Sequence, residues 1–190
     1  MLNFYKLIEI LVILQSLVIT TMLPVYIPLQ FIDKSSYGFE IPITWQIPTI
    51  ILLTLIFERK VVYKAFTIYL ILGLFIIPVF HQGGSVGYLL TPNFGYLLGI
   101  YPMIIVINKL NKRNKINIRN FLKNGFYAIV TMHLTGITYN FIQTIFYNKL
   151  NIFLYNLGKY SIGNIGYHLL MLFPLIILIR PIKHFKYNKQ

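Results

Sequence analysis

The stretch from residue 61 to residue 80, VVYKAFTIYLILGLFIIPVF, decides the fold class, because Lys64 is its only charged residue. An α-helix needs about 20 predominantly apolar residues to cross the hydrocarbon core of a bilayer. The charged turn Glu58-Arg59-Lys60 precedes this stretch, and a glycine-rich segment, residues 81–87, follows it. The stretch therefore predicts a membrane-spanning helix that ends at polar residues on both sides.

Similar apolar segments occur along the whole chain. Pro42 and Pro48 interrupt one of them, so the first half of that segment is expected to be irregular or re-entrant. Backbone groups in lipid must hydrogen-bond within their own segment, and the runs lack the alternation of a membrane β-strand. The sequence thus predicts a single all-α integral membrane domain, residues 1–190, with six transmembrane helices. The predicted spans are residues 4–23, 41–57, 61–80, 88–107, 124–147 and 163–179.

The composition excludes a water-soluble domain. Hydrophobic residues make up 57% of the chain and charged residues only 11%, whereas soluble domains carry about a quarter charged residues. So few charged side chains cannot form a polar shell around a domain of this size. The chain has no cysteine, which excludes disulfides and thiolate metal sites.

The basic residues predict the orientation of the chain. A net charge of +13 would suggest nucleic acid binding in a soluble protein, but these bases lie between apolar segments, and no nucleic acid partner is expected. With the N-terminus inside, only Lys34, Lys149 and Lys159 of the 17 Lys and Arg residues lie outside. Cytoplasmic loops of membrane proteins are enriched in Lys and Arg. We therefore expect a multi-pass protein of the cell membrane with both termini in the cytoplasm. The basic segment 109–119 could contact anionic lipid head groups or a cytoplasmic partner.

Polar side chains gather near the predicted outer ends of the helices, in residues 39–46, 92–96 and 163–168. Polar residues of a membrane helix normally face the interior of the bundle. The helix at 124–147 adds further polar residues, namely His133, Tyr139, Asn140 and Gln143. We therefore expect one ligand pocket that opens to the outside. The predicted ligand contacts are Thr44, Gln46, Asn93, Tyr96, Asn164 and Tyr167.

Three further features allow more than one interpretation. Trp45, the only tryptophan, could anchor the chain at the membrane interface or form a wall or lid of the pocket. Gly95 and Gly99 form a small-xxx-small pair, which is typical of close helix packing and compatible with a pocket beside it. Asn164 and Tyr167 are spaced to share one face of a helix that opens at Gly163.

Two patterns in the sequence could suggest an enzyme or a metal site. Residues 83–87, GGSVG, match the G-x-S-x-G pattern of serine hydrolases, with Ser85 as the nucleophile. That pattern has meaning on a strand-to-helix turn beside a histidine and an acid, whereas here it joins two predicted membrane helices, so no catalytic residue is expected. The histidines lack the i, i+4 spacing of metal ligands, so neither a metal nor a cofactor is expected. They are His81, His133, His168 and His184.

Three motifs together resemble those of a known family. Residues 41–46, IPITWQ, resemble the V-P-x-T-x-Q signature of the BioY family, the biotin-specific membrane subunits of energy-coupling factor transporters. Residues 68–80, IYLILGLFIIPVF, are similar to the family's Tyr followed by L-x-G-x-x-x-x-P-V-F and a glycine pair. Residues 91–99, TPNFGYLLG, are similar to P-T-x-G-Y-L-x-G. The resemblance is clearest over residues 41–108.

The resemblance implies a substrate-capture subunit that takes up biotin from outside the cell. It also implies a transmembrane coupling subunit and cytoplasmic ATPase subunits, because this chain has no Walker motif. The family often opens its last helix with G-D-x-x-K, where this chain has Gly163-Asn-Ile-Gly-Tyr167. An amide and a phenol can still hydrogen-bond a ureido ring and a carboxylate, but they supply no charge. A different vitamin or small solute, or an intramembrane hydrolase using Ser85, therefore remain alternatives.

Overall fold

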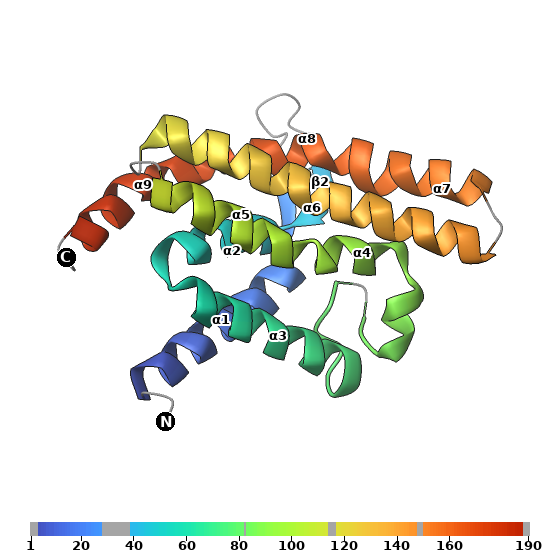
Figure 1. Ribbon diagram of the computed structural model, residues 1–190, viewed down its shortest axis with the longest axis horizontal. Helices are drawn as coiled ribbons and strands as arrows, with labels where there is room; N and C mark the ends of the chain where they lie inside the picture. The colour runs from blue at the N-terminus through green and yellow to red at the C-terminus, as the bar shows by residue number, and fades with distance from the viewer. Residues whose placement is uncertain (1–3, 28–38, 82, 114–116, 148–149, 188–190) are drawn as a thin grey trace.

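The computed structural model shows a bundle of α-helices with one small β-hairpin (Figure 1). It describes residues 4–27, 39–81, 83–113, 117–147 and 150–187. In chain order, the elements are α1 (Phe4–Met22), β1 (Pro24–Ile27), β2 (Phe39–Thr44), α2 (Gln46–Ile56), α3 (Arg59–Phe75), the 3-10 helix η2 (Val86–Leu90), α4 (Pro92–Leu98), α5 (Ile100–Arg113), α6 (Ile118–Tyr147), α7 (Leu150–Asn156), the π-helix η3 (Leu157–Ile162), α8 (Gly163–Leu170) and α9 (Leu172–Tyr187).

Several helices have the length and hydropathy of membrane spans. Within the described residues, three stretches are long and apolar enough to cross a bilayer, namely Phe4–Met22, Pro92–Lys112 and Asn151–Ile179. Large apolar side chains are exposed along all of them, for example Leu11, Ile105 and Ile177. A soluble protein rarely leaves such surfaces open to water. The chain is therefore a multi-pass membrane protein whose apolar outer surface faces lipid.

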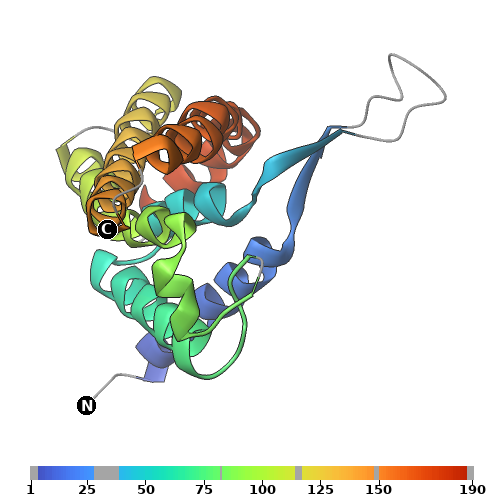
Figure 2. The same ribbon diagram turned by 90° about the vertical axis from the view of Figure 1, so that its right-hand side faces the viewer.

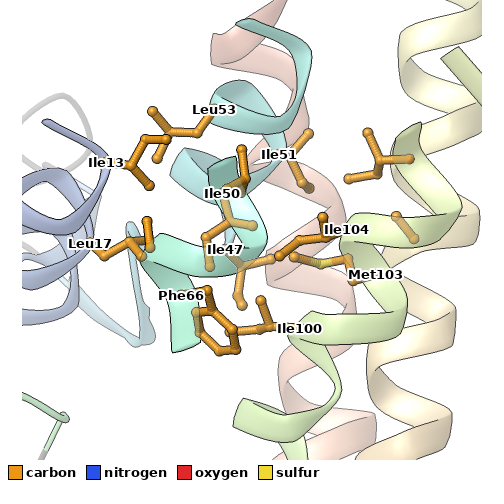
Figure 3. Close-up of a cluster of buried hydrophobic side chains, with 14 of the residues drawn as sticks. Ile13, Leu17, Ile47, Ile50, Ile51, Leu53, Phe66, Ile100, Met103 and Ile104 are labelled. Atoms are coloured by element: carbon orange, nitrogen blue, oxygen red, sulfur yellow. The ribbon is translucent and has the colours of Figure 1, made fainter. Parts of the chain in front are cut away.

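The core of the bundle surrounds α2, as Figure 3 shows. Ile50 and Ile51 of this helix are each only 1% exposed, and they lie among Leu17 of α1, Phe66 of α3 and Ile104 of α5. A helix that is apolar on all sides is stable only when other elements cover it. The short α2 therefore lies at the centre of the packing, and the longer helices surround it.

The predicted helices agree with the structure in part. Helices lie in each of the six predicted segments, and α1 matches residues 4–23 closely, whereas α3 ends at Phe75, five residues before the predicted end of the segment 61–80. The segment at 88–107 is divided into η2, α4 and α5, with breaks at Thr91 and Gly99. Close packing at Gly99 is confirmed, because a Cβ atom there would lie 2.5 Å from the carbonyl oxygen of Met132 on α6.

The predicted start of the last helix is wrong. Helical structure begins at Leu150 rather than at Gly163, and it continues through a π-helical turn. Gly158 and Lys159 make residues 150–162 resemble a loop in sequence, but their apolar neighbours extend the same helical surface. Gly163 consequently lies inside the helical segment, directly after the end of the π-helix η3.

The all-α prediction also missed a β-hairpin. Strands β1 and β2 pair in antiparallel fashion, with Val25 opposite Ile41 and an irregular register next to Pro24, and the hairpin projects away from the helices (Figure 2). The region before α2 is thus non-helical, as the two prolines predicted, but it is an ordered strand. Pairing of the two strands satisfies backbone groups that no helix satisfies there.

The contact at Gly99 generates a prediction about stability. We expect Gly99→Ala to destabilise the protein by about 1–3 kcal/mol, the usual cost of overpacking a close contact, because the new methyl group would collide with backbone of α6. Gly166→Ala is the matched control, since no atom lies within 4 Å of a Cβ atom at that position. Thermal unfolding of the purified variants in detergent measures both effects. Equal melting temperatures for the two variants would contradict the prediction.

Candidate ligand-binding site

A cavity of about 120 Å³ lies where the end of β2 meets α2, η2, α4, η3 and α8. Its lining combines polar and aromatic side chains with aliphatic ones. No Asp, Glu, Lys or Arg is among the lining residues. They are Ile43, Thr44, Gln46, Ile47, His81, Tyr88, Asn93, Tyr96, Leu97, Ile100, Met132, Tyr160, Asn164 and His168.

Most of the residues predicted to contact a ligand line this one cavity. They come from four elements that are far apart in sequence, which are β2, α2, α4 and α8. In the sequence, these residues had in common only that each is a polar residue near or within an apolar segment. The structure brings them together around one cavity. The predicted residues that line the cavity are Thr44, Gln46, Asn93, Tyr96 and Asn164.

Tyr167 is not part of this lining. It packs instead with Trp45 against a small separate cluster formed by Val25, Ile43 and Met171. Asn164 shares its cavity-facing side of α8 with His168, four residues later, rather than with Tyr167. Tyr167 and Trp45 thus hold the base of the hairpin against the last helix.

Two amide atoms at the cavity are buried without a hydrogen-bond partner. They are Nε2 of Gln46, a donor, and Oδ1 of Asn164, an acceptor. A buried polar group left unpaired costs about 1–3 kcal/mol, so such atoms mark a place where another polar molecule can bind. Gln46 and Asn164 therefore each bring to the cavity an amide group with hydrogen-bonding capacity left for a ligand.

A chain of hydrogen bonds lies behind the cavity wall. The hydroxyl groups of Tyr96 and Ser161 are 2.7 Å apart, and Nδ1 of His133 lies 3.3 Å from the Ser161 oxygen. Nε2 of His133 is in turn 3.1 Å from Nδ1 of His168. Since Tyr96 and His168 both line the cavity, this chain links the parts of its wall that come from α4 and α8.

The π-helix η3 places two of the site residues that the sequence did not reveal. Tyr160 lines the cavity, and Ser161 joins the hydrogen-bonded chain behind it. π-helical turns often occur at functional sites, but no residue pattern in 157–162 predicts one. The contact between His133 and His168 was also missed, because the two residues are 35 positions apart and belong to different helices.

The polar residues of α6 serve three different places. His133 belongs to the chain behind the cavity, whereas Tyr139 donates a hydrogen bond to the carbonyl oxygen of Leu89, as does Nε2 of Gln143 at 3.3 Å. Asn140 and Gln143 line a second cavity of about 200 Å³. Only part of the predicted polar surface of α6 therefore belongs to the ligand site.

The glycine-rich segment has a structural role. Ser85 has a φ of 129°, a backbone conformation that costs energy in a non-glycine residue, and its amide donates to the carbonyl oxygen of Gly73 at 3.0 Å. The segment thereby folds back onto the end of α3. Among the residues that the structure describes, no group of three or more His, Cys, Asp or Glu side chains could hold a metal ion.

Comparisons with known proteins agree on one family. The model of the BioY family matches residues 5–173. A relative from Lysinibacillus sphaericus, described as "Probable biotin transporter BioY", is 27% identical over 103 residues, and the match covers 54% of this chain and 53% of the relative. The chain thus aligns with about half the length of this curated relative.

A solved structure has the same fold. It is the crystal structure at 2.1 Å of the S-component for biotin from an ECF-type ABC transporter, with a TM-score of 0.62 and 20% sequence identity. The similarity covers 100% of this chain and 96% of that chain. The helical arrangement is therefore that of an S-component.

The chain of hydrogen bonds at Ser161 generates a second prediction. We expect Ser161→Ala to destabilise the protein by about 1–3 kcal/mol, because it removes the partner shared by Tyr96 and His133. Ser16→Ala is the control, since the exposed Ser16 hydroxyl donates only to the carbonyl oxygen of Val12 on its own helix. Thermal unfolding in detergent would show a lower melting temperature for the first variant alone. An unchanged melting temperature for Ser161→Ala would show that the chain of hydrogen bonds does not stabilise the site.

Proposed function

This chain belongs to the BioY family, and from this we propose that it captures biotin outside the cell as the substrate-binding subunit of an energy-coupling factor transporter. The observation that carries the proposal is the uncharged cavity in which Gln46 Nε2 and Asn164 Oδ1 have no partner. As a member of this family, the chain is a transporter subunit rather than an enzyme.

The two unpaired amide atoms match the ureido ring of biotin. That ring has one carbonyl acceptor and two N–H donors, so Nε2 of Gln46 would donate to the carbonyl and Oδ1 of Asn164 would accept from an N–H. Binding would then replace two unpaired buried groups with hydrogen bonds. Thr44, Asn93 and Tyr96 line the same cavity and are the remaining proposed contacts.

The rest of the cavity suits the apolar part of the ligand. Aliphatic side chains such as Ile47, Leu97 and Met132 form this part of the lining. A small-molecule site typically combines an apolar lining with a few fixed polar groups that orient the ligand. The sulfur ring and alkyl chain of biotin would contact this surface.

Lys159 is the proposed partner of the ligand's carboxylate. Its Nζ atom lies 5.3 Å from the ring centroid of Tyr160, and Tyr160 lines the cavity. An exposed ammonium group beside the site can move toward a carboxylate with little cost. Lys159 would thus supply a positive charge that Asn164 and Tyr167 do not.

We further propose six spans in one domain, residues 1–190, with both termini in the cytoplasm. The start of α1 and the end of α9 lie at the same end of the molecule (Figure 1), which supports an even number of crossings. The bases of α3, α5 and α6 gather near the turns that the positive-inside rule assigns to the cytoplasm. The ligand cavity would then face the outside.

Import would require partners. We propose a transmembrane coupling subunit and cytoplasmic ATPase subunits, as the family resemblance implies. Ser16 and Thr20, four residues apart on α1, form an approximate small-xxx-small pair that supports a docking site for the first of these, because their hydroxyl groups donate to carbonyl oxygens of their own helix. Small residues allow membrane helices to approach closely.

The unpaired amides lead to a prediction about binding. We expect Gln46→Ala and Asn164→Ala each to weaken biotin binding roughly tenfold or more, since each removes a buried hydrogen bond to the ligand. Gln143→Ala is the matched control, because Gln143 lines the second cavity instead. Titration calorimetry on purified protein measures the affinities, and uptake of radiolabelled biotin by cells shows whether transport follows. Unchanged affinity in both site variants, or equally tight binding of thiamine, which has no ureido ring, would exclude the proposed site and ligand.

The absence of cysteine makes the proposed topology directly testable. The variant Lys159→Cys is expected to react with a membrane-impermeant maleimide added to whole cells. The variants Lys60→Cys and Lys109→Cys are expected to react only after the membrane is permeabilised. All three positions are exposed in the structure, so differences in labelling report the side of the membrane. Labelling of Lys60→Cys in intact cells would reverse the proposed orientation.

A further inference from the structure

A second, chemically different cavity lies at the start of α3. It has a volume of about 390 Å³ and is lined by three bases and two large apolar or aromatic side chains. The bases are exposed to solvent in the isolated protein. The lining residues are Arg59, Lys60, Tyr63, Lys64 and Ile105.

These three bases have no acidic partner within the described part of the chain. The ion pair found there joins Lys6 Nζ to Glu58 Oε2 at 3.3 Å, so the carboxylate next to Arg59 in sequence is already held by a fourth base. The cavity consequently carries an uncompensated positive charge. Such a cavity is complementary to an anion.

The apolar side of the cavity is firmly held. The ring of Tyr63 packs on the ring of Tyr101 from α5, with centroids 4.6 Å apart. The Tyr101 hydroxyl group in turn lies 2.9 Å from the Thr67 hydroxyl group. Aromatic contacts between α3 and α5 thus form a fixed wall beside the bases.

An exposed apolar strip continues from the bases along α3. Lys60 and Lys64 are followed at spacings of three or four residues by Ile68, Ile71 and Phe75, so all five lie on one side of the helix. The three apolar side chains are exposed. From Lys64 to Phe75 the helix rises about 16 Å, close to the hydrocarbon thickness of one leaflet, which is about 15 Å.

We propose that this groove binds one anionic glycerophospholipid. The three bases hold its phosphate, and an acyl chain lies along the strip formed by Ile68, Ile71 and Phe75. A free phosphate ion would contact the bases alone and would gain nothing from the apolar strip beside them. A zwitterionic lipid would place its own ammonium group among the bases, where it is repelled. The groove therefore selects a lipid that has both a net negative head group and acyl chains.

The test compares soluble short-chain lipids on the full-length protein in detergent. Dioctanoyl phosphatidylglycerol is expected to raise the melting temperature in a saturable manner, whereas dioctanoyl phosphatidylcholine, glycerophosphoglycerol without acyl chains, and inorganic phosphate are expected to leave it unchanged. The effect is expected to weaken as salt is added, because screening reduces the attraction between exposed charges. Affinities follow from the dependence of the melting temperature on lipid concentration.

The variant Lys60→Gln/Lys64→Gln is expected to bind phosphatidylglycerol roughly thirtyfold more weakly, from the usual contribution of two bases near an anionic surface. Lys123→Gln is the control, because it removes an exposed base from α6 outside the basic segment 109–119 and is expected to retain the wild-type affinity. Equal losses in the two variants, or an equal response to inorganic phosphate, would overturn the proposal. So would a wild-type protein that does not respond to phosphatidylglycerol.

Discussion

The structure depends on the burial of one short helix. With 11 residues, α2 is only about 16 Å long, too short to cross the hydrocarbon core. The chain before it must therefore continue as non-helical backbone, which a membrane tolerates only where protein covers it or where it lines a cavity. The end of β2 meets the second condition, since Ile43 and Thr44 line the cavity, and backbone groups here are paired, because β1 pairs with β2 and the amide of Trp45 donates to the carbonyl oxygen of Leu23 at 3.2 Å. The first turn of α2 consequently begins inside the protein, and Gln46 faces the ligand cavity.

The sequence could predict those features that depend on whether a side chain is more stable in lipid or in the interior of the protein. Apolar length located the helices, and polar groups in apolar segments pointed inward, which is why Gln46, Asn93 and Asn164 were found. It could not predict features that depend on how helices meet. The pairing of His133 with His168 and the π-helical turn at Ser161 arise from packing between distant segments. The hairpin was missed for a similar reason, because prolines predict a break in a helix without specifying the strand that replaces it.

The last helix shows why segment boundaries are harder to predict than segments. Lys159 and Gly158 lower the apparent hydropathy before Gly163, so the helix was expected to begin at that glycine. In the structure the backbone remains helical through both residues, and the ammonium group of Lys159 lies near the rings of Tyr155 and Tyr160. A long basic side chain can reach polar surroundings while its backbone stays in the bundle. The charge at this position marks the edge of the site rather than the end of the helix.

The uncharged character of the cavity has a physical consequence for ligand capture. A fixed acid or base in such a site would lose its hydration when a ligand arrived, and that loss can exceed the attraction it provides. Neutral amides and phenols lose less, and in surroundings of low polarity their hydrogen bonds are stronger than in water. In the proposed binding mode, the neutral polar ring of a ligand would therefore bind Gln46 and Asn164 without a buried charge, while a charged group on the same ligand would lie beside the exposed Lys159. Asn164 and Tyr167 stand where the family often has an acid and a base, and in the proposed site only the base has a counterpart, the exposed Lys159.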